Sequence, residues 1–454
     1  MDLPLDEDRP LPRRSALSPA ATRARSPESP SDGADPAPPS PARRRPWLIG
    51  LGVAALAGAL VLFFLWQPGG ALGPSATPTP TIDPVATYLL QPADLAGISP
   101  ETAWDAATTA TEVSATTPQA KCVLPASETE PAAADSMVRT FAPTGGQPGA
   151  MLHQVDTYVT AEEAQAAYEQ RVAQLADCTR NTVLVSSGVL VEGLADQASG
   201  VRLVMQDAQP EYHTILVGRT GTRVNVVDAT HPADYVQPAT LAPALATVAS
   251  RQCAAGGTCP TQVAVSDAVP PVTEPPGWLA SVDLPRITSG SGQWRGTAEV
   301  KPTVDVTGTR CEAIELADVG GATASLQRTY LLQDDTRAPA NFGVDELLYI
   351  FSTPEEANAL VATLSGNIDG CAGRTATAQV ARSGDVSGAG TGAAWVVTQK
   401  VDQAAATARF RNAVVAVGNR VVYLLANPTN EFDFSDEAWH AVARRAAERA
   451  TQLP

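Results

Sequence analysis

Six cysteines are the residues of this chain whose type and spacing most clearly predict chemistry. A thiol can form a disulfide, bind zinc or act as a nucleophile, and its setting decides among these roles. No close Cys-x-x-Cys pair or Cys/His cluster is present, and the chain has only four histidines, so disulfides are favoured over a metal site. An even number of cysteines, all in the later part of the chain, is typical of an oxidising compartment. They are Cys122, Cys178, Cys253, Cys259, Cys311 and Cys371.

Two tryptophans and two arginines are candidates for ligand contact, because their positions recur in a repeat described below. Trp104 and Trp294 could line a cleft, although a repeated tryptophan near a disulfide is more often part of a core. Arg223 and Arg420 could hold an anionic ligand such as a phosphorylated lipid or a cell-wall fragment. They could equally pair with local acids at a sheet edge.

Recognised catalytic signatures are absent from the sequence. It contains no GxSxG, HExxH or SxxK motif and no Walker or Rossmann loop, and the histidines fall in separate predicted elements. The glycine-rich stretch 388–392 precedes a strand pattern, so it is interpreted as a loop. We therefore predict a protein that is not an enzyme and that uses no cofactor or metal.

Charge divides the chain into three parts. The formal net charge of −17 argues against nucleic-acid binding, which needs clustered cations. Residues 1–46 hold eight arginines and seven acids among many prolines, a composition that predicts a disordered tail. Residues 47–82 contain no charged side chain, so the part from residue 83 onward carries the acidic excess.

A membrane anchor is predicted for residues 47–66. This uncharged run of twenty residues would span about 30 Å as a helix, the thickness of the hydrocarbon layer. Arginines 43–45 precede it, which predicts a cytoplasmic N-terminus, a plasma-membrane location and an extracytoplasmic C-terminal part. The small residues Gly50, Ala54 and Gly58 lie on one face and would permit a weak homodimer. Residues 67–84 are interpreted as a Pro/Thr-rich spacer.

An internal repeat organises the rest of the chain. Asp94-Leu95 and Asp283-Leu284 each precede a tryptophan, a cysteine and an aromatic residue in the same order. The intervals from tryptophan to cysteine are 18 and 17 residues, and the next aromatic follows each cysteine by 19. Later come the matching helix starts 160–164 and 353–357, each with the Thr-x-x-Glu capping box.

Strand patterns and a final helix complete each repeat. Hairpins are predicted at Gly221 and Gly418, and Ala-rich helices near 239–252 and 435–451. One stripe of the first capped helix is apolar except for Arg171, whose counterpart is Leu364. The predicted fold is α+β, with tandem domains at 85–259 and 277–454 joined by a Pro-rich linker at 260–276.

The repeat selects one disulfide pattern from the fifteen that six cysteines permit. Cys122 and Cys178 occupy the same places in the first repeat as Cys311 and Cys371 in the second. We predict one bridge within each pair. The remaining cysteines, Cys253 and Cys259, most simply bond to each other.

These motifs together resemble the extracellular sensor domain of the mycobacterial PknH-type Ser/Thr kinases. The stretch 89–95 (LLQPADL) and the Cys122 to Cys178 segment carry the resemblance most closely, and the second repeat is more divergent. The resemblance implies a compact disulfide-bonded α+β fold with a broad cleft for an envelope ligand. Only 46 residues precede the predicted anchor in this sequence, so we expect the sensor-like part without a kinase domain. The alanine and arginine content suits a high-GC actinobacterium.

The sequence thus predicts a single-pass membrane protein that presents two sensor-like domains to a cell-envelope ligand or protein. A scaffolding envelope protein without a small ligand is the first alternative. An extracytoplasmic hydrolase with no recognisable motif is the second. No residue pattern identifies the ligand.

Overall fold

A computed structural model describes residues 83–98, 102–114, 116–125, 127, 130–178, 182–288, 291–303, 308–339, 342–400 and 407–453. The predicted tail, the predicted anchor at 47–66 with Gly50, Ala54 and Gly58, and most of the predicted spacer lie outside these residues. None of the helices in the described part is both long and apolar enough to cross a membrane.

The first half of the described chain, residues 83–268, is built on an antiparallel sheet of eight strands. Its runs of β-branched residues are buried on both faces, as expected for strands covered on two sides. In sheet order the strands are β1 (Trp104–Ala110), β2 (Asp135–Pro143), β3 (Ala150–Thr157), β7 (Arg223–His231), β6 (Glu211–Thr220), β5 (Gln197–Met205), β4 (Val183–Glu192) and β8 (Ala264–Ala268).

The second half, residues 277–453, repeats this strand order in an antiparallel sheet of seven strands. Each strand takes the place of a strand in the first sheet, and β8 alone has no counterpart. The same topology confirms the α+β prediction and the repeat of element order. In the matching order the strands are β9 (Gln293–Gly296), β10 (Ala324–Gln333), β11 (Gly343–Ile350), β15 (Arg420–Ala426), β14 (Thr407–Val417), β13 (Thr391–Lys400) and β12 (Ala378–Val386).

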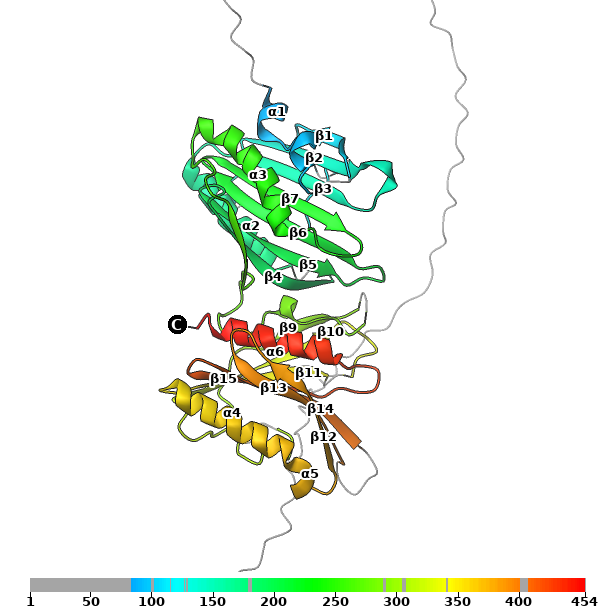
Figure 1. Cartoon of the computed structure of the whole chain (residues 1–454), viewed down its shortest axis with the longest axis vertical. Helices are drawn as coiled ribbons and strands as arrows, with labels where there is room; N and C mark the ends of the chain where they lie inside the picture. Colours follow the sequence, from blue (N-terminus) through cyan, green and yellow to red (C-terminus); the bar gives the residue numbers. More distant parts are fainter. Residues whose placement is uncertain are drawn as a thin grey trace, which may run out of the picture. The chain divides into compact units, whose positions relative to one another are not determined.

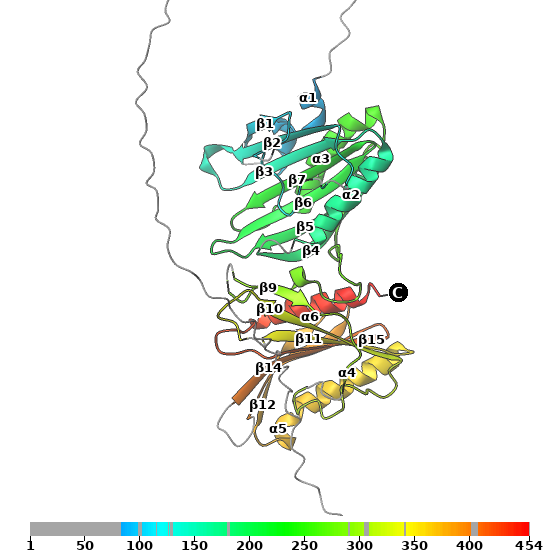
Figure 2. The same cartoon turned by 180° about the vertical axis from the view of Figure 1, so that it is seen from behind.

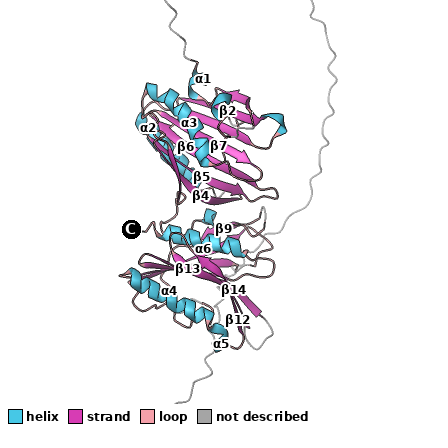
Figure 3. Ribbon diagram, in the orientation of Figure 1, coloured by secondary structure: helices cyan, strands magenta, loops and turns pink. Residues whose placement is uncertain are grey.

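Helices cover both faces of each sheet (Figures 1–3). Ile215 of β6 shares a hydrophobic cluster with residues of α2 (Ala161–Ala176), whereas its neighbour Leu216 packs with residues of α3 (Pro238–Gln252). The two helices therefore lie on opposite faces of the sheet. In the second sheet, Val414 of β14 packs with residues of α4 (Pro354–Asp369), and its neighbour Val415 packs with residues of α6 (Asp436–Ala450) on the other face. The α-helices are α1 (Pro84–Tyr88), α2 (Ala161–Ala176), α3 (Pro238–Gln252), α4 (Pro354–Asp369), α5 (Cys371–Arg374) and α6 (Asp436–Ala450).

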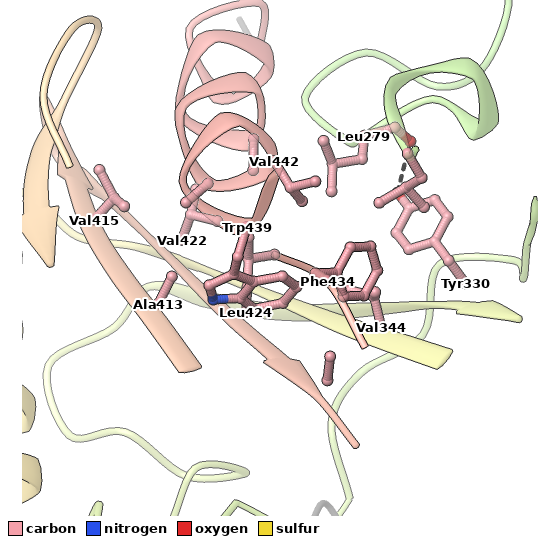
Figure 4. Close-up of a cluster of buried hydrophobic side chains, with 14 of the residues drawn as sticks. Leu279, Tyr330, Val344, Ala413, Val415, Val422, Leu424, Phe434, Trp439 and Val442 are labelled. Carbon is pink, nitrogen blue, oxygen red and sulfur yellow. Dashed lines mark hydrogen bonds between the residues drawn. The ribbon is translucent and has the colours of Figure 1, made fainter. Parts of the chain in front are cut away.

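The core beneath α6 is shown in Figure 4. Trp439 is fully buried against β14 and β15, next to Leu424, and its indole Nε1 donates to the carbonyl of Asn412 at 3.1 Å. Tyr330 lies at the edge of this cluster and donates to the carbonyl of Leu279 at 2.6 Å. Both aromatic residues therefore satisfy their polar atoms while burying large apolar surfaces.

Local signals in the sequence formed as predicted. Thr160 and Thr353 accept from the amides of Glu163 and Glu356 at 3.1 and 3.3 Å, and both glutamates bond back to their caps. The hairpin glycines have φ values of +58° at Gly221 and +55° at Gly418, which a residue with a Cβ adopts at a cost. The three predicted disulfides are all present: Cys122–Cys178, Cys253–Cys259 and Cys311–Cys371.

Two segment predictions need correction at their ends. The predicted linker 260–276 contains β8, which pairs with β4 because Val263 and Val265 pack on the first sheet's core. The predicted spacer ends one residue into α1, whose first position is Pro84 and whose cap is Asp83. Proline is favourable at this position because its missing N–H would have no helical partner.

The repeated Asp-Leu motif closes each half by joining its beginning to its last long helix. Asp94, in the 3₁₀ turn η1 (Pro92–Leu95), forms two bonds of 2.9 and 3.2 Å with Arg251 of α3. Asp283, in η4 (Ser281–Asp283), is bound by Arg449 at 2.8 and 3.0 Å and by Arg445 at 2.9 Å, both on α6. We call these two contacts the clasps.

A second repeated contact attaches the same segments to equivalent strands, β3 in the first sheet and β11 in the second. The amide of Leu90 donates to His153 Nδ1 at 3.0 Å, and the amide of Leu279 donates to Glu346 Oε2 at 3.1 Å. Burial lowers the pKa of His153 to about 4, so its ring is neutral and accepts at Nδ1. Burial raises the pKa of Glu346 to about 8.

The clasp of the second half should contribute more stability than that of the first. Asp283 and Arg449 side chains are fully buried, whereas Arg251 keeps 27% of its side-chain surface exposed. Asp283→Ala leaves a buried guanidinium unpaired and should cost about 3–5 kcal/mol. Asp94→Ala should cost about 1–2 kcal/mol, because water reaches Arg251. Urea unfolding of both variants measures this, and equal losses would contradict it.

The Leu90–His153 and Leu279–Glu346 contacts should make the stability of the protein depend on pH in opposite directions. The folded-state pKa of Glu346 is raised, so its stabilising contribution is complete below pH 4.5 and is lost as the pH rises through about 8. The pKa of His153 is lowered, so its contribution is complete above pH 6.5 and is lost as the pH falls through about 4. In the wild type, the midpoint of unfolding should therefore decline as the pH rises from 5 to 9, and Glu346→Gln should abolish this decline. A variant that keeps the wild-type slope would contradict this assignment.

Candidate functional site

A cleft of about 410 Å³ opens on the α2 side of the first sheet. It lies between the loop that joins β1 to β2, the first residues of β2, the end of β3 and the middle of α2. Its volume falls in the range of small-molecule sites. The lining residues are Thr111, Glu112, Val113, Gln119, Val123, Leu124, Pro125, Ala132, Ala133, Ala134, Asp135, Ser136, Gln154, Asp156, Tyr158 and Arg171.

The wall formed by the sheet and α2 is polar and buried. Asp156 is 1% exposed, and its carboxylate accepts from Gln154 Nε2 at 2.9 and 3.0 Å and from Ser136 Oγ at 2.8 Å. Arg171, on α2, places Nη2 3.3 Å from the same carboxylate. Burial, together with the nearby Asp156, raises the pKa of Tyr158 to about 12, so this phenol remains a neutral donor.

Two atoms of this wall are buried without a hydrogen-bond partner. They are Oε1 of Gln154 and Nε of Arg171, in residues only 6% and 5% exposed. The carboxylate of Asp156 accepts from Gln154 Nε2, which fixes the amide orientation and leaves Oε1 as an acceptor. A buried acceptor without a donor costs free energy, which a ligand that supplies the missing N–H or O–H would recover.

The second half provides an internal comparison for this wall. Measured from the capping threonines Thr160 and Thr353, the counterparts of the polar residues are all apolar or aromatic. They are Leu347 for Gln154, Tyr349 for Asp156, Phe351 for Tyr158 and Leu364 for Arg171. All four belong to one buried hydrophobic cluster. The same fold is therefore stable with an apolar core there, and stability alone does not require the charged set.

The loop over the cleft is held at several points. The disulfide from Cys122 joins it to the end of α2, and the amide of Lys121 donates to Asp228 at 2.8 Å. Arg171 Nη1 donates to the carbonyl of Leu124 at 2.8 Å. Cys122 itself has φ of +65°, a conformation that a residue with a Cβ rarely adopts. The described part of this loop is thus tied to β7 and to both the middle and the end of α2.

The tryptophans predicted as possible ligand contacts lie in cores. Trp104 is 8% exposed and packs with the residues under α3. Trp294 is 4% exposed, packs against Phe434 at a ring distance of 5.9 Å and donates to the carbonyl of Pro285. Both tryptophans therefore lie in a core, the alternative given for them from the sequence, and neither lines the cleft.

The two repeated arginines also lie away from the cleft. Arg223 places its guanidinium 4.3 Å from the centre of the Tyr88 ring, a cation–π contact. Arg420 donates to the carbonyl of Leu453 at 3.1 Å. Each binds a segment near the beginning or end of its own half. Ser383 Oγ lies 3.0 Å from His440 Nε2, and this pair also lies outside the cleft lining.

The sequence contained one signal for the site. Arg171 interrupts an otherwise apolar helix stripe, and a charge on a buried face requires a buried partner. Asp156 could not be assigned as that partner, because the strand alternation alone does not say which acid faces the helix.

Comparisons with protein-family models, curated proteins and solved structures found no match to this chain. The resemblance to PknH-type sensor domains therefore stays a prediction.

Mutagenesis can test whether the Asp156–Arg171 ion pair is required for the stability of the fold. Arg171→Met leaves a buried carboxylate without a counter-charge and should cost about 3–5 kcal/mol. Asp156→Asn combined with Arg171→Met removes both charges while the introduced amide oxygen still accepts from Gln154, and should recover at least half of the loss. Urea unfolding with both single variants completes the cycle. A double variant no more stable than Arg171→Met alone would contradict this account.

Proposed function

We propose that this chain is a single-pass membrane protein that presents two tandem sensor-like domains outside the cytoplasm and binds a small cell-envelope ligand in the cleft of the first. The predicted anchor at 47–66, the disulfides and the resemblance to PknH-type sensor domains support this assignment. The three disulfides support an oxidising location.

One observation carries the ligand-binding proposal. The first half holds a buried polar set with an unpartnered acceptor in an open cleft, at positions where the second half has a filled apolar core. A purely scaffolding domain has no reason to replace that core with buried charges, because the replacement costs desolvation energy. In this proposal the first domain binds, and the second is a structural copy that lacks the cleft residues.

Blocking the cleft should abolish ligand capture. Ala134 lines the cleft and is exposed, so Ala134→Trp can fill the cleft without disturbing the core. Thr323→Trp is the matched control. Ala134 directly precedes β2 and Thr323 directly precedes β10, the second strand of each sheet, and their amides donate to the carbonyls of Thr157 and Ile350 on the neighbouring strands. The full-length protein in detergent is incubated with an envelope extract, and the small molecules that it retains are measured by mass spectrometry. The wild type and Thr323→Trp should retain the same molecule. Ala134→Trp should retain at least tenfold less of it.

Retention of that molecule by Ala134→Trp would place the site elsewhere. If neither the wild type nor the control retains any small molecule, the scaffold alternative would replace the proposal.

A further inference from the structure

We propose that the cleft of the first half selects an organic cation, a protonated amine or a guanidinium carried on an aliphatic stem. This inference rests on the proposed function and names the class of ligand for that site.

Charge at the cleft is negative once internal pairs are counted. Three carboxylates, from Glu112, Asp135 and Asp156, line it against the single guanidinium of Arg171. Arg171 is neutralised by Asp156 at 3.3 Å. Glu112 and Asp135 are exposed, and neither forms an ion pair with another residue of the described chain. The unbalanced charge of the cleft is therefore two carboxylates at its rim.

The buried wall also contains an acceptor that lacks a hydrogen-bond donor. Gln154 Oε1 has no partner, although its residue is 94% buried, and an ammonium or guanidinium group supplies several N–H donors. The unpartnered Arg171 Nε does not favour an anion, because its guanidinium already serves Asp156, the carbonyl of Leu124 and Gln174. The unpartnered acceptor of the wall and the carboxylates of the rim thus favour the same ligand chemistry.

The remaining lining suits a short apolar stem. Val113, Val123 and Ala133 contribute aliphatic surface beside the polar wall. Such a mixture matches side chains and small molecules that carry a charge at the end of a methylene chain. An anionic ligand would face two unpaired carboxylates within a chain of net charge −17, which disfavours both its approach and its binding.

One ligand chemistry here has two possible sources: a free polyamine, or the lysine side chain of a peptide. Cadaverine represents the first, and acetyl-Gly-Lys-Gly amide represents the second. The neutral 1,5-pentanediol and the anionic glutarate have the same chain length as cadaverine and serve as comparisons. Binding of each to the full-length protein in detergent is measured by isothermal titration calorimetry.

The amines should bind at least tenfold more tightly than pentanediol or glutarate. Glu112→Gln combined with Asp135→Asn should weaken amine binding about tenfold and leave pentanediol unchanged. Glu162→Gln combined with Glu192→Gln changes net charge equally, at exposed positions outside the cleft, and should have no effect. A preference for cadaverine over the peptide would indicate a free amine, and the reverse would indicate a peptide side chain.

Several outcomes would overturn the inference. Tighter binding of glutarate or pentanediol that Ala134→Trp abolishes would reject the cation while leaving the cleft as the ligand site. Equal loss of amine binding in both charge-neutralised double variants would assign the effect to net charge. Absence of amine binding up to 20 mM, roughly a hundredfold weaker than common metabolite-binding sites, would also reject it.

Discussion

Removing a charge from water is the constraint that organises this protein. An unpaired buried ion costs several kcal/mol, so each one must meet a partner with good geometry. Asp283 meets two arginines of α6, and Asp156 meets Arg171 together with Ser136 and Gln154. The first arrangement closes a half of the molecule and satisfies its charges completely. The second leaves Gln154 Oε1 and Arg171 Nε without partners at the wall of an open cleft.

The two halves show how one topology can be used in two ways. Both have the same strand order, capped helix, disulfide and anchoring contact. In the second half, the space under the capped helix is filled by residues such as Tyr349 and Leu364. In the first half, the equivalent space is lined by buried polar groups and opens as a cleft. The scaffold therefore tolerates either a polar or an apolar filling at these positions.

Much of the fold could be predicted because its signals are local. A Thr-x-x-Glu box satisfies helix amides within one turn, and a hairpin glycine acts within four residues. The disulfides followed from comparing the repeats, since equivalent positions must be equally distant in space. Trp104, Trp294, Arg223 and Arg420 recur for the same reason, but recurrence reports shared packing, and none of them lines the cleft. The cleft residues differ between the repeats, so the repeat could not point to them.

The sequence by itself determined the α+β elements, the duplicated order and the pairing of cysteines, because each depends on short-range stereochemistry or on comparison within the chain. Only the tertiary structure decided that Asp156 faces Arg171, that the linker adds strand β8, and that the polar wall of the first half lines a cleft of about 410 Å³. These features depend on which side chains from distant segments share one face of a sheet. That selection is made by packing and by the cost of desolvating charge, and neither is visible in a linear pattern.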